Sequence, residues 1–219
     1  MTASTPRHRL SRRRLLAAGA AVVGGATAGC LGGGGGTDDT VTPHQQLPHP
    51  TAGDPNADVT VAAFEDFACP HCREYNEQVV PHVWDEYVTP GTITYVHYDF
   101  PIPVDRTVSW QAPSAARSVQ KGTDAATFFE YAARLFDDQS RLGPDVYAEL
   151  ANDVGADGKA ARAAATNGTY RPTIVADRKT GVDRGVKGTP TIFVDGVDVT
   201  EKHGDHSFDS IKAEIEAHR

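Results

Sequence analysis

Two cysteines separated by two residues, Cys69 and Cys72, are the side chains in this sequence whose type and spacing point most directly to chemistry. Such a pair can supply half of a zinc site, form a structural disulfide, or act as a dithiol that exchanges disulfides with other proteins. Zinc needs two further ligands, and the compact candidates, His203 and His206, are spaced more tightly than zinc sites usually require. A disulfide closing so short a loop stabilises little, because its stabilisation grows with loop length. The spacing therefore favours a reactive dithiol.

The elements around the pair predict where the two thiols lie. Residues 58–67 predict a strand, because apolar side chains occur at Val59, Val61 and Phe64. Residues 70–88 predict a helix, because Pro70 suits a first turn and apolar residues recur on one face, although Pro81 should kink it. The residues of that apolar face are Tyr75, Val79, Val83 and Tyr87.

The predicted helix gives the two thiols different roles. Cys69 lies at the N-terminus, where unpaired N–H groups and the helix dipole favour a thiolate, so we expect an acidic, exposed nucleophile. Cys72 lies one turn further in and is placed to attack a mixed disulfide on Cys69 and release the substrate. His71 can lower the pKa of Cys69 further by a hydrogen bond or a positive charge. The residues expected to tune the pKa values are His71, Pro70, Glu65 and Asp66.

Three residues just before the pair have two interpretations each. Glu65 or Asp66 either accepts the proton of Cys72 or tunes Cys69, or else is a solvated strand end. Phe67 either floors an apolar groove for a substrate peptide or belongs to the core. The other aromatic residues near the pattern are expected in the core.

Two stretches resemble a known family. The sequence FEDFACPHC after a strand resembles the active site of thioredoxin-fold proteins, particularly the DsbA-like branch, which has the same Pro-His dipeptide between its cysteines. The sequence VKGTPTIFVDG, residues 186–196, resembles the loop of that fold in which a proline, here Pro190, follows a cis peptide bond and packs beside the cysteines. The resemblance implies that Thr189 presents its backbone to an extended substrate peptide.

The rest of the chain fits the same layout. A second strand over 92–103 is followed by a helical pattern, then by a hairpin with its turn at Asp195-Gly196 and a closing helix over 208–219. The DsbA-like branch is an α/β thioredoxin fold with a helical insertion, which implies a domain over 58–219 with its insertion at about 104–186. The apolar faces of the insertion are Phe128, Phe129, Ala132, Leu135 and Phe136, and Val146, Leu150 and Val154 before Gly155.

The first residues have the three parts of an export signal: bases, an apolar run over 15–28 that is too short to span a membrane, and small residues. The Arg12-Arg13 pair resembles a twin-arginine signal, and the ending ATAGC resembles a lipobox. Residues 1–29 are thus a signal peptide, and a lipid on Cys30 would anchor the protein on the outer face of the cell membrane. Alternatively, the signal is cut elsewhere or retained. Residues 30–57, rich in Gly and Pro, are expected to form a flexible tether.

Charge and composition limit the classes of partner that the protein can bind. The formal net charge of −8 argues against binding to nucleic acid. An acidic sequence with 6 lysines resembles proteins of halophilic archaea. Asn167, in an Asn-Gly-Thr triplet, is either a glycosylation site or a helix cap.

We predict a thiol–disulfide oxidoreductase that oxidises dithiols of exported proteins and is recycled by a membrane redox partner, with no cofactor. Two alternatives stay open. Thr189, the residue before the proline, also resembles the residue at this place in reductases and isomerases. Such a protein would receive its electrons from a membrane electron donor. A redox-inactive lipoprotein that binds peptides in the groove is the other.

Overall fold

The computed structural model of the protein describes residues 46–102 and 104–219. The expected signal peptide, the lipobox with Cys30 and most of the expected tether lie outside these residues. In the part of the chain that is described, no helix combines the length and apolarity needed to cross a membrane.

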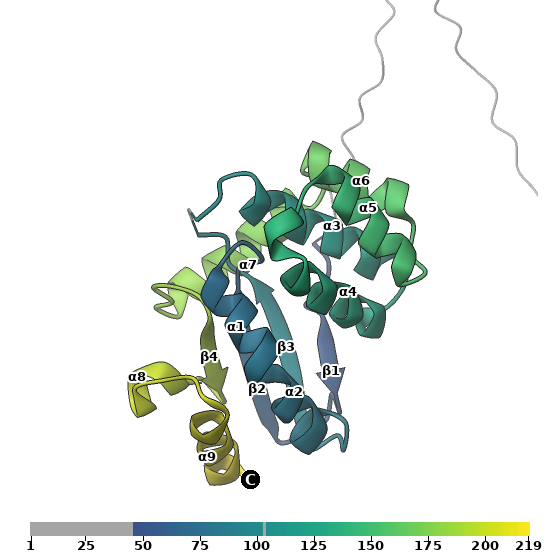
Figure 1. Ribbon diagram of the computed structural model, residues 1–219. Helices are drawn as coiled ribbons and strands as arrows, with labels where there is room; N and C mark the ends of the chain where they lie inside the picture. The colour runs from purple at the N-terminus through teal and green to yellow at the C-terminus, as the bar shows by residue number, and fades with distance from the viewer. Residues whose placement is uncertain (1–45, 103) are drawn as a thin grey trace, which may run out of the picture. The chain divides into compact units, whose positions relative to one another are not determined.

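A five-stranded mixed sheet forms the centre of the described chain, in the order β1-β3-β2-β4-β5. Figure 1 labels β1 to β4 of this sheet. The central strands β2 and β3 are parallel to each other, and the remaining neighbours are antiparallel. Nearly every residue of β2 and β3 is buried, as expected for strands covered on both faces. The strands are β1 (Thr51–Gly53), β2 (Val59–Glu65), β3 (Ile93–Asp99), β4 (Thr191–Val194) and β5 (Val197–Asp198).

Strand β1 corrects the expected tether, because residues 51–53 belong to the sheet. Thr51 lies opposite Val96 of β3, and His97 N–H donates to the carbonyl of Pro50 at 3.0 Å. Gly53 has a φ of 83°, and a Cβ there would lie 2.1 Å from the carbonyl oxygen of Ile93. A short edge strand is held by backbone hydrogen bonds, so its Gly- and Pro-rich sequence gives little sign of it.

One face of the sheet is covered by helices from two parts of the chain, the segment that begins just after Cys69 and the C-terminal segment. Apolar side chains at alternate positions of β2, Val59, Val61 and Ala63, pack in one core with residues of these helices. The helix predicted over 70–88 breaks at Val79, two residues before Pro81, where the kink was expected. The elements are α1 (Pro70–Gln78), α2 (Val80–Val83), the π-helical turn η1 (Trp84–Val88), α8 (Val199–His203) and α9 (Phe208–His218).

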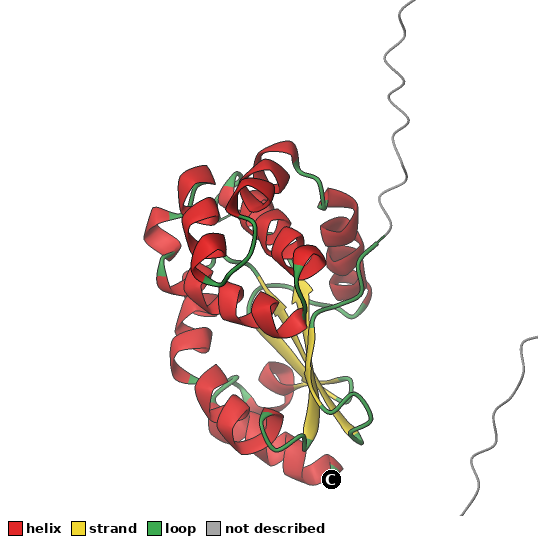
Figure 2. Ribbon diagram, turned by 90° about the vertical axis from the view of Figure 1, so that its right-hand side faces the viewer, coloured by secondary structure: helices red, strands yellow, loops and turns green. Residues whose placement is uncertain are grey.

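The predicted helical insertion is present between β3 and β4. Its own apolar core includes Phe128, Leu135 and Leu150, which the sequence placed on helix faces, and it also takes in both cysteines. Figure 1 shows α4, α5 and α6 grouped together, and Figure 2 shows the helices beside the strands. The elements are α3 (Val108–Gly122), α4 (Ala125–Asp137), the 3₁₀ turn η2 (Gln139–Arg141), α5 (Pro144–Asp153), α6 (Gly158–Asn167) and α7 (Arg171–Asp183).

Helix α7 packs against the second face of the sheet and leads into the loop that contains Pro190. Its closest approach is at Gly181, where an added Cβ would lie 2.5 Å from the ring of Phe100 and 3.0 Å from the ring of Phe64. Both rings are buried, so neither has room to move aside.

We expect Gly181→Ala to lower the free energy of unfolding by about 1–3 kcal/mol, because the new methyl group overpacks this contact. Gly122→Ala is the matched control: a Cβ there meets nothing within 4 Å, and alanine favours the helix. Urea unfolding of both variants measures the difference. Equal stabilities of the two variants would show that α7 packs differently.

Candidate active site

The thiol pair lies where the sequence placed it, at the start of α1. Cys69 is the N-cap residue with an extended backbone, and Pro70 occupies the first turn. The N–H of Cys69 donates to the carbonyl of Asp66 at 2.9 Å, which closes the turn between β2 and α1. Cys72 lies one turn inside the helix, and both cysteines are free thiols.

Cys69 is more buried than the sequence suggested, with only 3% of the residue exposed. The expectation of an exposed nucleophile is therefore corrected: the cis Thr189–Pro190 loop lies against the sulfur, and Sγ donates to the carbonyl of Thr189 at 3.3 Å. The pKa of Cys69 is nevertheless lowered to about 5. The hydrogen bond from the Cys72 thiol contributes most, burial opposes it, and hydrogen bonds from Thr189 and from the backbone of Cys72 and His71 add to the lowering.

His71 acts on Cys69 through its backbone rather than its side chain. The imidazole is 75% exposed, and its Nδ1 lies 3.9 Å from a carboxylate oxygen of Glu74. The sequence analysis expected the His71 imidazole to stabilise the Cys69 thiolate. The backbone N–H of His71 does so instead, and any residue except proline supplies that group.

Cys72 is fully buried, and its environment has the opposite effect. Burial raises its pKa well above the ordinary value, and the hydrogen bond to Cys69 and the negative charge of Glu65 raise it further. The N–H of Asp66 lies 3.5 Å from Sγ and partly offsets this. At neutral pH Cys72 therefore keeps its proton while Cys69 loses its own.

The two acids at the end of β2 are both buried, and they face different groups. Asp66 accepts backbone N–H groups from Ala68 at 2.9 Å and Ile102 at 2.8 Å; burial raises its pKa to about 6 against these bonds. Glu65 accepts from Asn76 at 2.5 Å and lies 3.2 Å from Nδ1 of His97. Neither is a solvated strand end, and Glu65 is the acid whose charge raises the pKa of Cys72.

A groove of about 600 Å³ opens beside the cysteines. It is lined on one side by His71, Thr189 and Pro190, and on the other by Thr200 and His206 of the C-terminal segment. The structure thus brings the residues of the two predicted motifs together at one surface.

A family model described as thioredoxin matches residues 45–217. The chain belongs to the thioredoxin family. Disulfide bond formation protein D of Bacillus subtilis is 24% identical over 173 residues, which cover 76% of this chain and 75% of that protein. The crystal structure of oxidised BdbD from Bacillus subtilis has a TM-score of 0.70 at 22% identity, covering 78% of this chain and 92% of the other. Chlamydia trachomatis DsbA has a TM-score of 0.68 at 22% identity, covering 80% and 94%.

The structure decides between the two interpretations of Phe67, and it shows a role for Gln139 that the sequence analysis missed. Phe67 is 1% exposed and its ring centroid lies 4.8 Å from that of Phe136, so it belongs to the core and not to the groove. Gln139, in the turn after α4, donates to the carbonyls of Phe67 and Cys69, each at 2.9 Å. This amide ties the insertion to the thiol loop, and no local pattern marks it.

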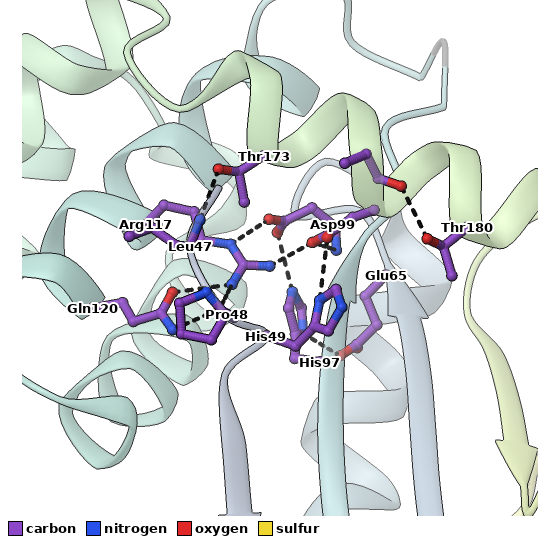
Figure 3. A network of polar contacts seen from close by, with 12 residues as sticks. Leu47, Pro48, His49, Glu65, His97, Asp99, Arg117, Gln120, Thr173 and Thr180 are labelled. Carbon is purple, nitrogen blue, oxygen red and sulfur yellow. Dashed lines mark hydrogen bonds and ion pairs between the residues drawn. The ribbon is translucent and has the colours of Figure 1, made fainter. Parts of the chain in front are cut away.

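A buried network of charges continues from Glu65 away from the thiols (Figure 3). His97 bridges Glu65 and Asp99 at 3.2 Å each, and Arg117 binds Asp99 at 2.7 Å and Asp177 at 2.5 Å. Burial alone would lower the pKa of His97, but its two carboxylate partners raise the value to about 9. The imidazole is therefore a cation at neutral pH and balances the two acids beside it.

The segment before β1 closes this network at its far end (Figure 3). The carbonyl of Pro48 accepts hydrogen bonds from Arg117 at 3.3 Å and from Gln120 at 3.0 Å. His49 Nδ1 lies 3.2 Å from Asp177, and Leu47 N–H donates to Thr173 at 3.3 Å. These contacts join residues far apart in sequence, so sequence reasoning had no signal for them.

The remaining candidates are Asn167 and the two histidines considered as zinc ligands. Asn167 is exposed at the end of α6, and Gly168 follows in the left-handed conformation of a helix cap; glycosylation stays a prediction. His203 binds Glu214 at 2.8 Å, while His206 packs its ring edge against Tyr75. Across residues 46–102 and 104–219, no three His, Cys, Asp or Glu side chains are grouped as metal ligands would be.

We expect the Cys69 thiolate of the reduced protein to titrate with a midpoint near pH 5, followed by thiolate absorbance and by the rate of alkylation. Because this pKa is depressed, the thiolate stabilises the reduced fold fully above the ordinary thiol pKa, and that stability is lost as the pH falls through about 5.

Cys72→Ala removes the hydrogen bond that contributes most, so it should raise the pKa of Cys69. An unchanged midpoint in that variant would mean that Thr189 and the N–H groups of the first helical turn set the pKa of Cys69. Cys72→Ser keeps a hydrogen-bond donor in place, so the pKa of Cys69 in this variant should lie between the values of the unmodified protein and of Cys72→Ala.

Proposed function

We propose that this protein is a thiol–disulfide oxidoreductase that oxidises dithiols of exported proteins through the Cys69–Cys72 pair. The opposite pKa shifts of the two thiols carry the proposal. A stabilised thiolate at Cys69 favours the reduced form of the pair, so the disulfide form is a strong electron acceptor. The similarity to a disulfide bond formation protein supports the same activity.

The exchange is written for the disulfide form of the pair. A substrate thiolate attacks Sγ of Cys69, the Cys69–Cys72 bond breaks, and Cys72 leaves and takes up a proton. The second substrate thiolate then attacks the substrate sulfur of the mixed disulfide, and Cys69 leaves as a thiolate. Two electrons pass from the substrate to the pair, and the substrate gains one disulfide. The low pKa of Cys69 makes it the better leaving group in the second step.

Glu65 is the group we assign to carry the proton of Cys72. Its carboxylate raises the pKa of that thiol, and it lines a hollow of about 540 Å³ together with Asn76 and His97. The hollow gives solvent a path to the carboxylate. Asp66 is excluded from this role because both of its oxygens accept backbone N–H groups.

The cellular setting follows from the N-terminal sequence. Residues 1–29 as a twin-arginine-type signal and a lipid on Cys30 would place the domain on the outer face of the cell membrane, linked by the Gly-rich residues that follow Cys30. There no thiol buffer opposes disulfide formation. A membrane redox partner would reoxidise the pair.

The reduction potential of the pair, from equilibration with glutathione, tests the direction. We expect a value near or above about −180 mV. A value below about −250 mV would make the protein a reductant that receives electrons from a membrane donor and would overturn the proposal.

Cys69→Ser should abolish the oxidation of a reduced substrate protein. Full function in that variant would support the redox-inactive, peptide-binding alternative.

Glu65→Gln should slow proton-coupled release of Cys72 by about a hundredfold, because the carrier is lost while the side-chain shape is kept. Stopped-flow measurement of mixed-disulfide formation with a reduced peptide follows this step. Glu74→Gln is the matched control, since this acid lies on α1, the helix that contains Cys72, and its side chain is 62% exposed. Equal rates in both variants would show that the proton takes another route.

A further inference from the structure

Two exposed apolar side chains of the domain lie on the same helix, α7. Among the described residues, the large apolar side chains that stay about half exposed are Val104 at 52%, Val175 at 49% and Val182 at 51%. Val175 and Val182 lie two turns apart on α7, and Val104 lies in the loop between β3 and α3. Val175 and Val182 line the same cavity, so together they form one apolar surface that a partner can contact.

The same place is hollowed. A cavity of about 600 Å³ lies between α7 and the β3–α3 loop, with Val175, Val182 and Ile102 on its walls and Trp110 of α3 at one side. A second hollow of about 380 Å³ continues from it towards the end of α6 and shares Arg106 and Trp110 with the first. We call these two joined hollows the α3–α7 groove.

The α3–α7 groove is basic, although the chain as a whole carries a net charge of −8. Its described lining residues include no acid, and its bases are Arg106, Arg171, Arg178 and Lys179. Two acids lie at the rim: Asp183, which pairs with Lys179 at 2.5 Å, and Asp105, whose carboxylate accepts the N–H groups of the first turn of α3. The hollow beside Glu65 is the opposite, because it is lined by acids and contains no Lys or Arg.

The cations are held in place around the aromatic wall. The guanidinium of Arg171 lies 4.0 Å from the centroid of the Trp110 ring, and Arg178 donates to the carbonyl of Pro101 at 3.1 Å while lying over Phe100. Each keeps donors free for an anion, since a guanidinium has five N–H groups. The groove thus combines ordered positive charge with an apolar floor.

We propose that the α3–α7 groove binds an acidic, amphipathic peptide segment of a partner protein, with apolar side chains in the hollows and carboxylates on the surrounding bases. A peptide fits better than an anionic bilayer for two reasons. Projecting side chains fill hollows, whereas a bilayer surface does not, and the net negative charge of the chain opposes approach to an anionic membrane. The groove is separate from the one beside Thr189 and Pro190, with which it shares no lining residue.

The position of the groove connects a bound partner with the thiol site. Its wall includes Pro101 and Ile102, and the Ile102 N–H holds the carboxylate of Asp66 at 2.8 Å. A peptide seated there contacts the loop that orders the end of β2. The proposal itself concerns binding and holds whichever way the thiols exchange electrons.

The test is the binding of a fluorescent synthetic peptide to the full chain, measured by anisotropy. The probe has leucines at helical spacing among aspartates and glutamates; the comparison peptides replace its leucines by serines or its acids by lysines. We expect binding of the first peptide alone. Added salt should weaken it, because the charged contacts lie at the surface.

Two variants separate the contributions. Arg106→Glu with Lys179→Glu should weaken binding at least about tenfold through charge, and Val175→Ser with Val182→Ser should do so through lost apolar contact. All four positions are exposed, so the folds should be kept, which circular dichroism checks. Lys121→Glu with Lys159→Glu is the matched control, with the same change in charge at the opposite ends of α3 and α6, and should bind normally.

Three results would overturn the proposal. The first is no binding of the acidic peptide to the unmodified protein. The second is equal binding by both groove variants and the control. The third is binding of phosphatidylglycerol vesicles, lost in the groove variants, without binding of the peptide, which would assign the groove to the membrane.

Discussion

The buried guanidinium of Arg117 holds together the parts of the domain that the thiol site requires. It belongs to α3, binds Asp99 at the end of β3 and binds Asp177 in α7, the helix that leads to the Pro190 loop. A charge this deeply buried is tolerated only when fully paired, and removal of one partner costs about 3–5 kcal/mol. Through Asp99 and His97 the contacts continue to Glu65. The insertion, the sheet and the loop are thus placed relative to one another by a single ion network.

The chemistry depends on a difference between two thiols one helical turn apart. The first-turn N–H groups and the neighbouring thiol stabilise the anion on Cys69, whereas burial and a nearby carboxylate keep Cys72 protonated. Each effect strengthens the other, because the proton retained by Cys72 is the donor that Cys69 uses. The buried imidazolium of His97 lies 3.2 Å from Glu65 and places a positive charge beside this carboxylate. The site therefore separates a leaving group from a proton acceptor within one turn of helix.

Charge is distributed unevenly over the domain in a way that the net value conceals. Acids line the hollow that reaches Glu65, and bases line the groove between α3 and α7. In an acidic chain with few lysines, bases gathered around Trp110 create a local field of opposite sign. Such a field orients an acidic partner before contact, and the apolar walls then provide the short-range attraction.

The sequence by itself determined the strand–turn–helix around Cys69 and the helices between the two motifs, because these rest on local spacing and on periodic apolar residues. The loop at Pro190 and the layout of a split core were predicted from the resemblance to the DsbA-like branch. Tertiary structure alone decided the environment of these residues. It buried Cys69 under the Pro190 loop, moved Phe67 into the core and brought Gln139 to the thiol loop. It also drew Thr51–Gly53 into the sheet. Polar partners from distant segments meet because burial forces each charge and each backbone group to find one, and neither requirement leaves a periodic trace in sequence.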